Sequence, residues 1–343
     1  MRNLFVTSAE ACAIIRSGAI ATFAGSEAAL SLLQPGQWIG GTTVYFMTSQ
    51  GGVVDSDRLF CTIIDAAVSA RFACIASGDI PSVTTGQYEN GFTYIMVPAF
   101  SEAHRHYAIE APSFPDLYSQ PLIGWVTGVP AEKIGQVPAR VFFGPTGESF
   151  DDALLALYVE LPEDLCAVTD TVNLFTQGYG PSIVFPRTSF SARDCLIDGV
   201  PGQIGRYLSN CDTKLPLVAD YAGIMMNVGI RSVDAKDGSA QFYAPVVSGE
   251  PYRLAQSIHD YPGAYRHGAV ATVEPATTIS CNCILNFLYA GLEGKSAGGY
   301  IGPVTFGEIS YILVNQTLVR LSLESIAGAE RDLSSGVQRG DHE

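Results

Sequence analysis

Short apolar runs, each bounded by glycine, proline or charged residues, recur along the first half of the chain. Runs of roughly four to eight residues that are rich in β-branched and aromatic side chains are typical of strands. This pattern predicts strands at Ala19–Ala24, Gln37–Thr48, Leu59–Ile64, Arg71–Ile75, Thr93–Pro98 and Leu174–Thr176. Gly40 and Gly41 interrupt the second of these, where the backbone has to turn or approach another group closely.

Helix signals are fewer. Thr7 and Glu10 have the spacing of a capping box at the start of a short helix, and Ser26 opens a second one. Phe150–Tyr158 is interpreted as a third helix. The first half therefore alternates strands with helices.

The second half continues in short elements. A loop rich in Gly, Pro and Ser occupies Gln177–Ala192, and Asp234–Ser239 has the composition of a surface turn or linker. Strand-like sequence follows at Leu217–Ile230, Gln241–Val247, Tyr252–Ile258 and Phe306–Leu323. We predict an α+β fold of two domains with mixed β-sheets flanked by helices. The expected divisions are 1–233 and 234–327, followed by a polar tail over 328–343.

The charge balance limits the classes of partner. The 343 residues include 34 acidic and 19 basic side chains, a formal charge of −15, and no run of Lys or Arg occurs. Nucleic-acid binding draws its affinity from Lys and Arg that neutralise phosphates. We therefore expect neither a nucleic acid nor a membrane surface as a partner.

The cysteines and the N-terminus indicate the compartment. The eight cysteines lie mostly in apolar strings, Cys61 and Cys74 among them, as buried free thiols do in a reducing compartment. Glu10 and Arg16 interrupt any signal-peptide core, and no uncharged apolar run reaches the roughly 18 residues of a membrane-spanning helix. We expect a cytoplasmic protein.

Several motifs follow one another near the C-terminus: Ser280-Cys281 opening an apolar helix, Gly298-Gly299-Tyr300, Phe306-Gly307-Glu308-Ile309 and Asn315-Gln316-Thr317. With Ile39-Gly40-Gly41-Thr42-Thr43 upstream, this order resembles FIST domains, which are bacterial sensory modules thought to bind small ligands such as amino acids. The resemblance implies a FIST N-terminal-like domain over 1–233, a FIST C-terminal-like domain over 234–327, and a diverged member. Asn282-Cys283 departs from the family, whose members usually carry a small residue, Gly and Arg after the first Cys.

Glu308 is the first candidate for a ligand contact. A carboxylate set between Phe306-Gly307 and Ile309 is costly to bury unless a cation or hydrogen-bond donor meets it, and a ligand ammonium would suit. The alternative is a structural glutamate that binds backbone amides or an internal Arg. The residues expected near the ligand are Glu308, Gly307, Asn315, Gly40, Gly41, Thr42, Tyr300 and Cys281.

Arg187 and Arg193 bracket the segment 188–192 in the loop rich in Gly, Pro and Ser. In a chain this poor in cations, a pair of arginines can bind a carboxylate bidentately. The alternative is that each arginine pairs with one of the many surface acids.

An enzymatic alternative uses Cys281 or Cys195 as a nucleophile with His259 as its base. No metal site is indicated, because no Cys-x-x-Cys or His-x-x-x-His pair occurs and His104-Arg105-His106 is expected on an exposed helix or loop. Phosphate-loop and dinucleotide motifs are also absent, so no cofactor is expected.

Three hypotheses remain open. The first is a sensory protein that holds an amino acid or small carboxylate between two lobes, without catalysis, at a pocket lined by residues of both. Such a protein needs a signalling partner protein or a responsive homo-oligomer, because no output module is attached. The second is a Cys-dependent hydrolase or transferase, and the third is an interaction scaffold.

Overall fold

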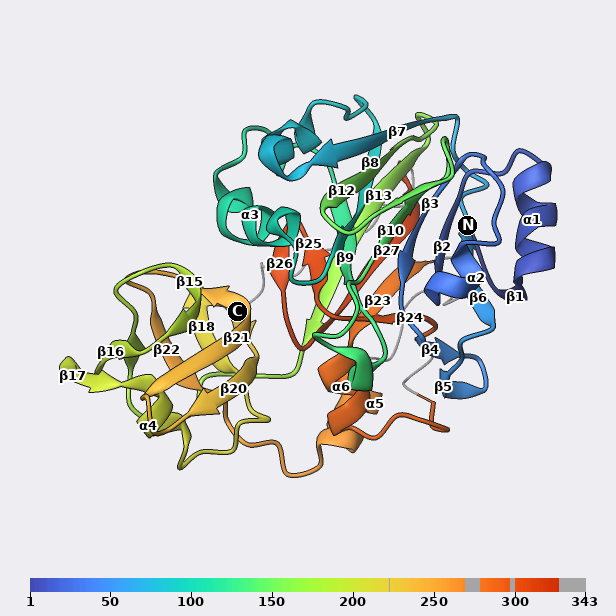
Figure 1. Ribbon diagram of the computed structural model, residues 1–343. Helices are drawn as coiled ribbons and strands as arrows, with labels where there is room; N and C mark the ends of the chain where they lie inside the picture. Colours follow the sequence, from blue (N-terminus) through green and yellow to red (C-terminus); the bar gives the residue numbers. More distant parts are fainter. Residues whose placement is uncertain (222, 269–277, 297–299, 327–343) are drawn as a thin grey trace, which may run out of the picture.

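The computed structural model describes residues 1–221, 223–268, 278–296 and 300–326. The described chain forms a large body and a small lobe that projects from one side of it (Figure 1). We call the elements between residues 183 and 254 the small lobe and the remaining elements the body. The predicted α+β class with mixed sheets is confirmed, because parallel pairs such as β2–β3 and β8–β9 occur beside antiparallel ones.

The first sheet of the body carries two helices on its outer face. α1 (Ser8–Arg16) has the predicted capping box between Thr7 and Glu10, and α2 (Glu27–Leu30) begins after the N-cap Ser26. The strands, in spatial order, are β1 (Arg2–Thr7), β6 (Arg58–Ile63), β2 (Ala21–Gly25), β3 (Trp38–Thr42), β10 (Val141–Phe143) and β11 (Glu148–Phe150).

The second sheet is covered by α3 (Glu102–Glu110) and the short helices η1 (Ser77–Thr84) and η2 (Ala111–Ser113). Its strands, in order, are β26 (Ile312–Val314), β25 (Glu308–Ser310), β9 (Leu122–Thr127), β8 (Gly91–Pro98), β12 (Ala153–Glu160) and β7 (Ser69–Ala76). Strands from the C-terminal end thus complete a sheet begun near residue 70.

The third sheet also joins distant segments. β13 (Leu165–Asn173) pairs along its whole length with β27 (Thr317–Ser325), and β24 pairs with β4. The remaining strands are β23 (Ile279–Cys283), β24 (Gly302–Thr305), β4 (Tyr45–Thr48) and β5 (Gly51–Val54). Helices α5 (Tyr261–Gly268) and α6 (Ile284–Tyr289) and the short helix η3 (Ala131–Lys133) lie outside the sheets.

The buried side chains show how the layers stack. Ile15 and Leu30 of the helices share one cluster with Phe23 and Trp38 of the first sheet. A second cluster joins the other face of this sheet to the second and third sheets, and a third joins the second sheet to α3. The first sheet therefore packs one face against α1 and α2 and the other against the second and third sheets, and the second sheet packs in turn against α3.

The small lobe is almost entirely β-structure. Its larger sheet contains β17 (Val200–Gln203), β16 (Asp194–Ile197), β14 (Ile183–Val184), β22 (Pro251–Leu254), β18 (Leu217–Tyr221) and β19 (Ile224–Val228). Its smaller sheet contains β15 (Ser189–Ala192), β21 (Ser239–Val246) and β20 (Ile230–Asp234), and α4 (Ile204–Leu208) packs beside it.

The turn predicted at Asp234–Ser239 joins β20 to β21 in one hairpin, with Asp234 opposite Ser239. Sheet pairing therefore groups the chain differently from the expected division at 233/234. β13 and β27, which lie on the two sides of that division, are neighbours in the body. In the sequence, the small lobe is one continuous stretch between two segments of the body.

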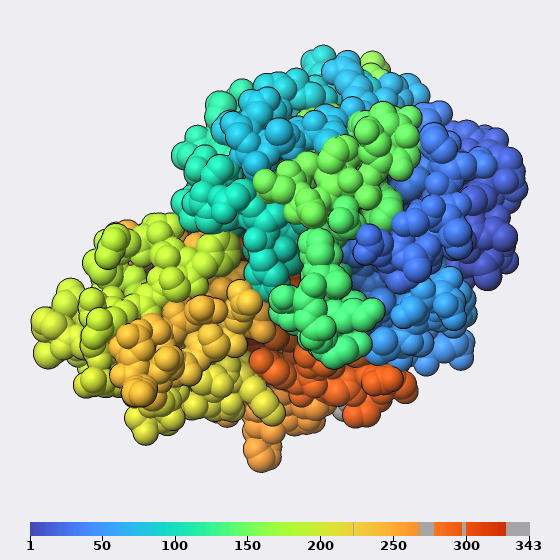
Figure 2. Space-filling view, viewed as in Figure 1, coloured from blue at the N-terminus to red at the C-terminus, as the bar shows by residue number. Residues whose placement is uncertain are grey.

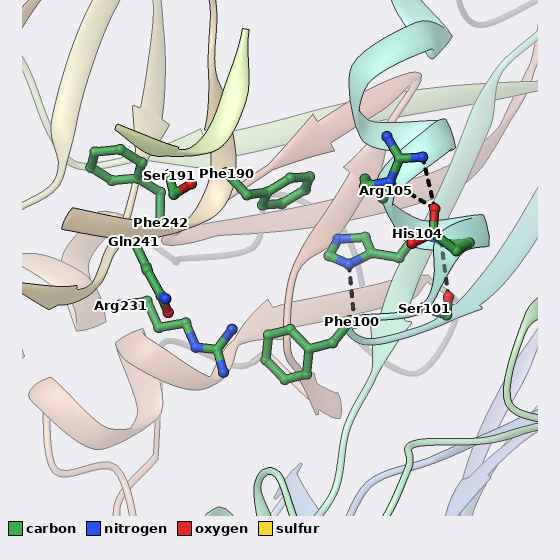
Figure 3. A pocket seen from close by; sticks show the side chains of 10 residues that line it. Phe100, Ser101, His104, Arg105, Phe190, Ser191, Arg231, Gln241 and Phe242 are labelled. Atoms are coloured by element: carbon green, nitrogen blue, oxygen red, sulfur yellow. Dashed lines mark hydrogen bonds and ion pairs between the residues drawn. The ribbon is translucent and has the colours of Figure 1, made fainter. Parts of the chain in front are cut away.

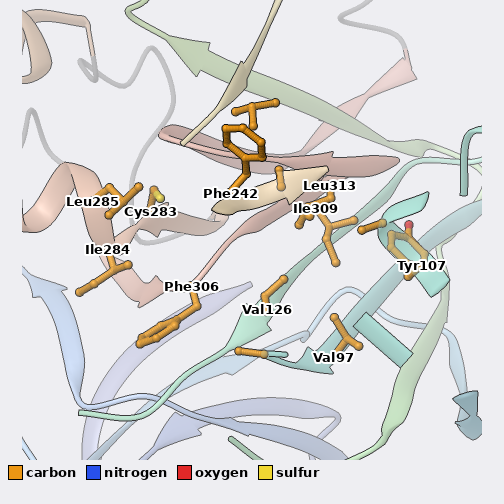
Figure 4. Close-up of a cluster of buried hydrophobic side chains, with 14 of the residues drawn as sticks. Val97, Tyr107, Val126, Phe242, Cys283, Ile284, Leu285, Phe306, Ile309 and Leu313 are labelled. Atoms are coloured by element: carbon orange, nitrogen blue, oxygen red, sulfur yellow. The ribbon is translucent and has the colours of Figure 1, made fainter. Parts of the chain in front are cut away.

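The body and the small lobe share a hydrophobic core. One cluster contains Phe242 of β21 together with Tyr107 of α3 and Ile309 and Leu313 of the body (Figure 4). Because these side chains are nearly inaccessible, their burial fixes the small lobe against the body.

Several element predictions are wrong. Ser280 and Cys281 lie in β23 and do not open a helix, since α6 begins at Ile284. The loop predicted over Gln177–Ala192 contains β14 and β15. Phe150–Tyr158 is not a helix: β12 lies between β7 and β8 and is buried along nearly all its length, so its continuous apolar run matches both faces of a central strand. Leu174–Thr176 lies beyond the end of β13 and is not a strand.

Among the described residues, no helix is long and apolar enough to cross a membrane. The predicted tail over 328–343 and the glycines at 298 and 299 lie outside the described residues. All eight cysteines are described and are free thiols. Cys61 is buried as expected, whereas Cys74 is exposed, because β7 is the edge strand of its sheet.

Candidate functional site

Glu308 is completely buried, at 0% exposure, at the start of β25. One carboxylate oxygen, Oε2, accepts from the hydroxyl of Thr317 over 2.9 Å and from its backbone N–H over 3.3 Å. The other, Oε1, lies 3.2 Å from the hydroxyl of Thr305. No Lys, Arg or His of the described chain forms an ion pair with this carboxylate.

Burial raises the pKa of Glu308 to about 8, although the hydrogen bonds from Thr317, Thr305 and Cys283 act in the opposite direction. The carboxyl group is therefore largely protonated at neutral pH. The described chain forms several surface clefts, and Glu308 is not a lining residue of the four best-formed of them.

Buried amides extend the polar cluster around Glu308. Asn286 donates from Nδ2 to Oδ1 of Asn282 over 3.0 Å and to the carbonyl of Thr317 over 3.2 Å, and it accepts from the hydroxyl of Tyr261. Nδ2 of Asn282 and the hydroxyl of Tyr265 have no hydrogen-bond partner among the described residues. This Glu308 network joins β23, β25, β27 and α6, and its hydrogen bonds fit the structural alternative for the glutamate.

The cysteine beside Glu308 is Cys283. Its thiol hydrogen bonds to the carboxylate, and burial raises the pKa of that thiol well above its usual range. Cys281 instead lies 3.4 Å from the carbonyl of Gly124, and burial also raises its thiol pKa well above the usual range. Burial raises the pKa of Cys195 to about 11. His259, the expected base, is exposed. A nucleophilic thiol needs a lowered pKa, so these sites do not favour thiol catalysis.

The double glycine of β3 marks close packing between sheets. A Cβ on Gly41 would lie 2.5 Å from Cγ2 of Thr127 and 2.8 Å from the indole of Trp125. Trp125 is also the cross-strand neighbour of Glu308. Thr42 exchanges hydrogen bonds with the backbone of Arg140, over 3.3 and 2.9 Å. Gly41 thus lies one side chain away from Glu308, whereas Gly40 faces Leu30 and Trp38 on the other side of β3 and Thr42 binds Arg140.

Two further candidates have backbone contacts. The hydroxyl of Tyr300 donates to the carbonyl of Pro303 over 2.6 Å, and Gly307 pairs through its carbonyl with the N–H of Val126 over 2.8 Å. Gly307 therefore lies in the turn directly before Glu308, and Tyr300 holds the start of β24.

Asn315 connects the body to the small lobe. Its Oδ1 accepts from the backbone N–H of Gly229 over 3.0 Å, and a Cβ on Gly229 would lie only 2.5 Å from this oxygen. Gly229 precedes β20, which carries Arg231. Asn315 therefore positions the first residues of β20.

Arg187 and Arg193 line the same cleft, of about 570 Å³, on the small lobe beside β15. The structure thus brings these two candidates together and does not bring them to Glu308. Neither arginine forms an ion pair with a carboxylate of the described chain.

A second cleft, of about 270 Å³, lies between the body and the small lobe, where the two meet in Figure 2. We call it the interlobe cleft. The body contributes Phe100, Ser101, Glu102, His104 and Arg105 from the start of α3 and the turn before it. The small lobe contributes Phe190, Ser191, Arg231, Gln241 and Phe242 from β15, β20 and β21.

His104 is the most unusual side chain of this cleft. Contrary to the expectation of an exposed position, the residue is only 5% exposed, and burial lowers its pKa to about 4, so the ring is neutral at pH 7. Nδ1 accepts the backbone N–H of Phe100 over 3.3 Å, which leaves the ring proton on Nε2. Nε2 is buried and has no partner among the described residues. A buried donor without an acceptor is costly, so it marks a place where a ligand acceptor would be stabilised.

Arg231 and two phenylalanines surround this donor (Figure 3). The guanidinium carbon of Arg231 lies 4.3 Å from the ring centroid of Phe100, and Arg231 has no ion-pair partner among the described residues. Phe190 packs against His104 at 5.3 Å between ring centroids. A cation, a neutral imidazole donor and aromatic walls are the groups that bind a carboxylate attached to an apolar body.

The carboxylates of Glu102 and Asp152, near the cleft, already have partners within the protein. Glu102 pairs with Arg105 over 2.7 Å, and Oδ1 of Asp152 accepts from the N–H of Ala103 over 2.8 Å at the start of α3. Beyond Phe100 the surface continues into a neighbouring groove of about 540 Å³ that is lined by Val129, Ile134, Val137 and Phe306. The described residues contain no group of three or more His, Cys, Asp and Glu side chains that could hold a metal ion.

The apolar face of α3 was the signal for His104. Ala103, Tyr107 and Ala108 are buried together with it, and helical spacing places His104 beside Tyr107 and Ala108 on one face. Arg231 and Phe190 have no comparable sequence signal, because they reach the cleft only through the position of the small lobe.

Comparison with known proteins gives one match to a family. A model described as a family of unknown function, DUF6976, matches residues 6–324 of the chain. A search among curated proteins finds no match.

Proposed function

The chain belongs to the DUF6976 family, whose function is unknown, and we propose from its geometry that it is a sensory protein that binds a small carboxylate between its two lobes. The observation that carries this proposal is the buried, unpartnered Nε2–H of His104 at the wall of a cleft built from both lobes. An amino acid or a small organic acid has the required group.

The chemistry of the cleft suits a carboxylate better than a cation or a neutral polar group. Arg231 supplies a planar set of N–H donors and a charge, and the neutral His104 supplies one directed donor. The carboxylate of Glu102, which lines the cleft, is paired with Arg105 and forms no ion pair with Arg231. An incoming carboxylate would therefore meet donors that lack acceptors.

The apolar part of the ligand would lie against Phe100, Phe190 and Phe242. Because Nε2 of His104 is buried and the Phe190 ring packs against the imidazole, we infer that ligand entry requires this ring to move. Movement of a ring that belongs to the small lobe couples occupancy of the cleft to the contact between the lobes. Such coupling is the physical requirement for a sensory response in a partner protein or a homo-oligomer.

Two further features support a FIST-like, cytoplasmic sensor. The motif residue Asn315 holds the segment that leads to Arg231, and the motif residue Phe306 lines the groove that continues from the cleft. The eight free thiols fit a reducing compartment. The Cys-dependent alternative is less favourable, because burial raises the pKa of both Cys281 and Cys195.

A thermal-shift screen with amino acids and small carboxylates tests the proposal. A ligand that binds only the folded protein raises the melting temperature, and we expect at least one carboxylate to do so. The shift should be lost in Arg231→Gln and kept in Arg16→Gln, a matched change on the exposed end of α1. A library without any shift, or a shift that survives Arg231→Gln unchanged, would overturn the proposal.

A further inference from the structure

The cleft beside Arg187 and Arg193 is continuous with the interlobe cleft. Ser191 and Gln241 line both of them. These two residues are direct partners in the ladder between β15 and β21, so their side chains lie on the same face of the small sheet. The surface that begins at His104 therefore passes over this pair and continues to the two arginines.

Arg187 precedes β15 in the sequence, and Arg193 directly follows it. Both are exposed, and hydroxyl groups of Thr188 and Ser189 line the cleft between them. Asp194 also lines this cleft but forms no ion pair with either arginine. The cleft thus combines two free guanidinium groups with small donors, which is the composition of a site for a carboxylate or a phosphate.

The arginines along this surface stand out because the chain as a whole is acidic. The chain has 19 basic residues and a formal charge of −15. Even so, Arg231, Arg187 and Arg193 lie along one continuous surface, and none of them has an acidic partner within the described residues. A positive groove on an acidic protein attracts anions locally and raises their rate of association.

We propose that the ligand of the interlobe cleft carries a second anionic group and that Arg187 and Arg193 bind it. This inference rests on the proposed function, because the first carboxylate is the one bound by Arg231 and His104. The ligand class is a short chain with an anionic group at each end. A dicarboxylate and a carboxylate that bears a phosphate or phosphonate share this chemistry.

Calorimetric titration of the full chain with two matched series tests the inference. The dicarboxylates succinate, glutarate and adipate are compared with butyrate, pentanoate and hexanoate, and phosphonoacetate provides the phosphonate arm. We expect one dianion to bind about tenfold tighter or better than the monoanion of equal length. The member of the series that binds best then reports the separation between the two anion sites.

Variants separate this inference from the proposed function. The double variant Arg187→Ala/Arg193→Ala should reduce the affinity for the best dianion to that of its monoanion, without changing the monoanion affinity. Arg206→Ala removes an exposed arginine of the same lobe as a control. If monoanions bind and dianions bind no tighter, or if the double variant leaves the dianion affinity unchanged, the inference fails and the proposed function stands. If neither series binds the wild-type protein, both fail.

Discussion

Nδ1 of His104 accepts the backbone N–H of Phe100 over 3.3 Å, and Phe100 adopts a left-handed backbone with φ of 65°. A bulky side chain rarely adopts this conformation, which costs on the order of 1 kcal/mol or more. The hydrogen bond fixes the imidazole of His104, a residue that lines the interlobe cleft and whose Nε2 is buried without a partner among the described residues. The conformation also places the Phe100 ring against Arg231. One strained residue thus orients both proposed carboxylate-binding groups.

Replacement of His104 by Leu should weaken carboxylate binding about tenfold, because it removes one directed donor from a buried site. Leucine keeps the apolar contact with Phe190 and removes the buried Nε2–H, but it leaves the backbone N–H of Phe100 without its acceptor, so we expect the melting temperature without ligand to change little. Calorimetric titration and thermal melts measure the two quantities. His259→Gln is the control, because His259 is exposed and does not line the interlobe cleft. Equal losses of affinity in both variants would contradict the role of His104.

Two substitutions at Phe100 separate backbone strain from ligand contact. Phe100→Gly should melt at a higher temperature than Phe100→Ala, because glycine adopts positive φ without strain and alanine does not. Both variants lose the ring beside Arg231, so both should bind the carboxylate more weakly than the wild-type protein. A Phe100→Gly protein that melts below Phe100→Ala would show that the positive φ stores no strain.

The stability of the protein should decrease as the pH rises toward 8, through Glu308. The pKa of this carboxyl is raised from its ordinary value to about 8 in the folded state, so between these values the folded state holds a proton that the unfolded state releases. Stability then falls with rising pH by at most about 1.4 kcal/mol per pH unit. Denaturation of the wild-type protein and Glu308→Gln at several pH values tests this.

The Glu308→Gln variant should lack this slope, because a glutamine does not titrate. His104 acts only at lower pH: its folded pKa of about 4 lies below the ordinary value, so it lowers stability only as the pH falls below about 6.5. Between about pH 6.5 and 8, the slope therefore reports Glu308 and not His104. A wild-type protein whose stability changes no more between about pH 6.5 and 8 than that of Glu308→Gln would refute the raised pKa of Glu308.

Asn315 should affect ligand affinity without touching the ligand. Asn315→Ala removes the acceptor for the Gly229 N–H and frees the segment that carries Arg231, so the carboxylate affinity should fall severalfold. Asn90→Ala is the control, because Asn90 donates to the carbonyls of Leu161 and Pro162 within the body. Hydrogen exchange should rise at Gly229 in the first variant alone. An unchanged affinity in Asn315→Ala would remove its positioning role.

Local signals predicted the elements better than the site. The capping box of Thr7 and Glu10 and the strand pattern of Thr93–Pro98 were sufficient, because a cap and a strand depend on neighbouring residues. The run Ala153–Glu160 was ambiguous: its leucines and alanines favour a helix, and only pairing with β7 and β8 makes it a strand. Burial of Glu308 followed from its apolar flanks, whereas its partners Thr305 and Thr317 come from two other strands.

The interlobe cleft could not be predicted from the sequence. Arg231 lies in a polar hairpin that is exposed in the small lobe, and it becomes a ligand candidate only because that lobe packs beside α3. Arg187 and Arg193 were identified as candidates because basic residues are scarce in this acidic chain. The structure places both in one cleft. Their distance from Glu308 depends on the pairing of β13 with β27, a contact between segments about 150 residues apart.

Nitrogen-15 NMR of histidine-labelled protein gives the most direct measurement of the central relationship, because the chain has only five histidines. With a carboxylate that raises the melting temperature, the Nε2 resonance of His104 should shift at saturation, while that of the exposed His259 stays in place. The His104 resonance is assigned by its loss in His104→Leu. Saturation with a bound carboxylate that leaves the His104 resonance unchanged would contradict the account.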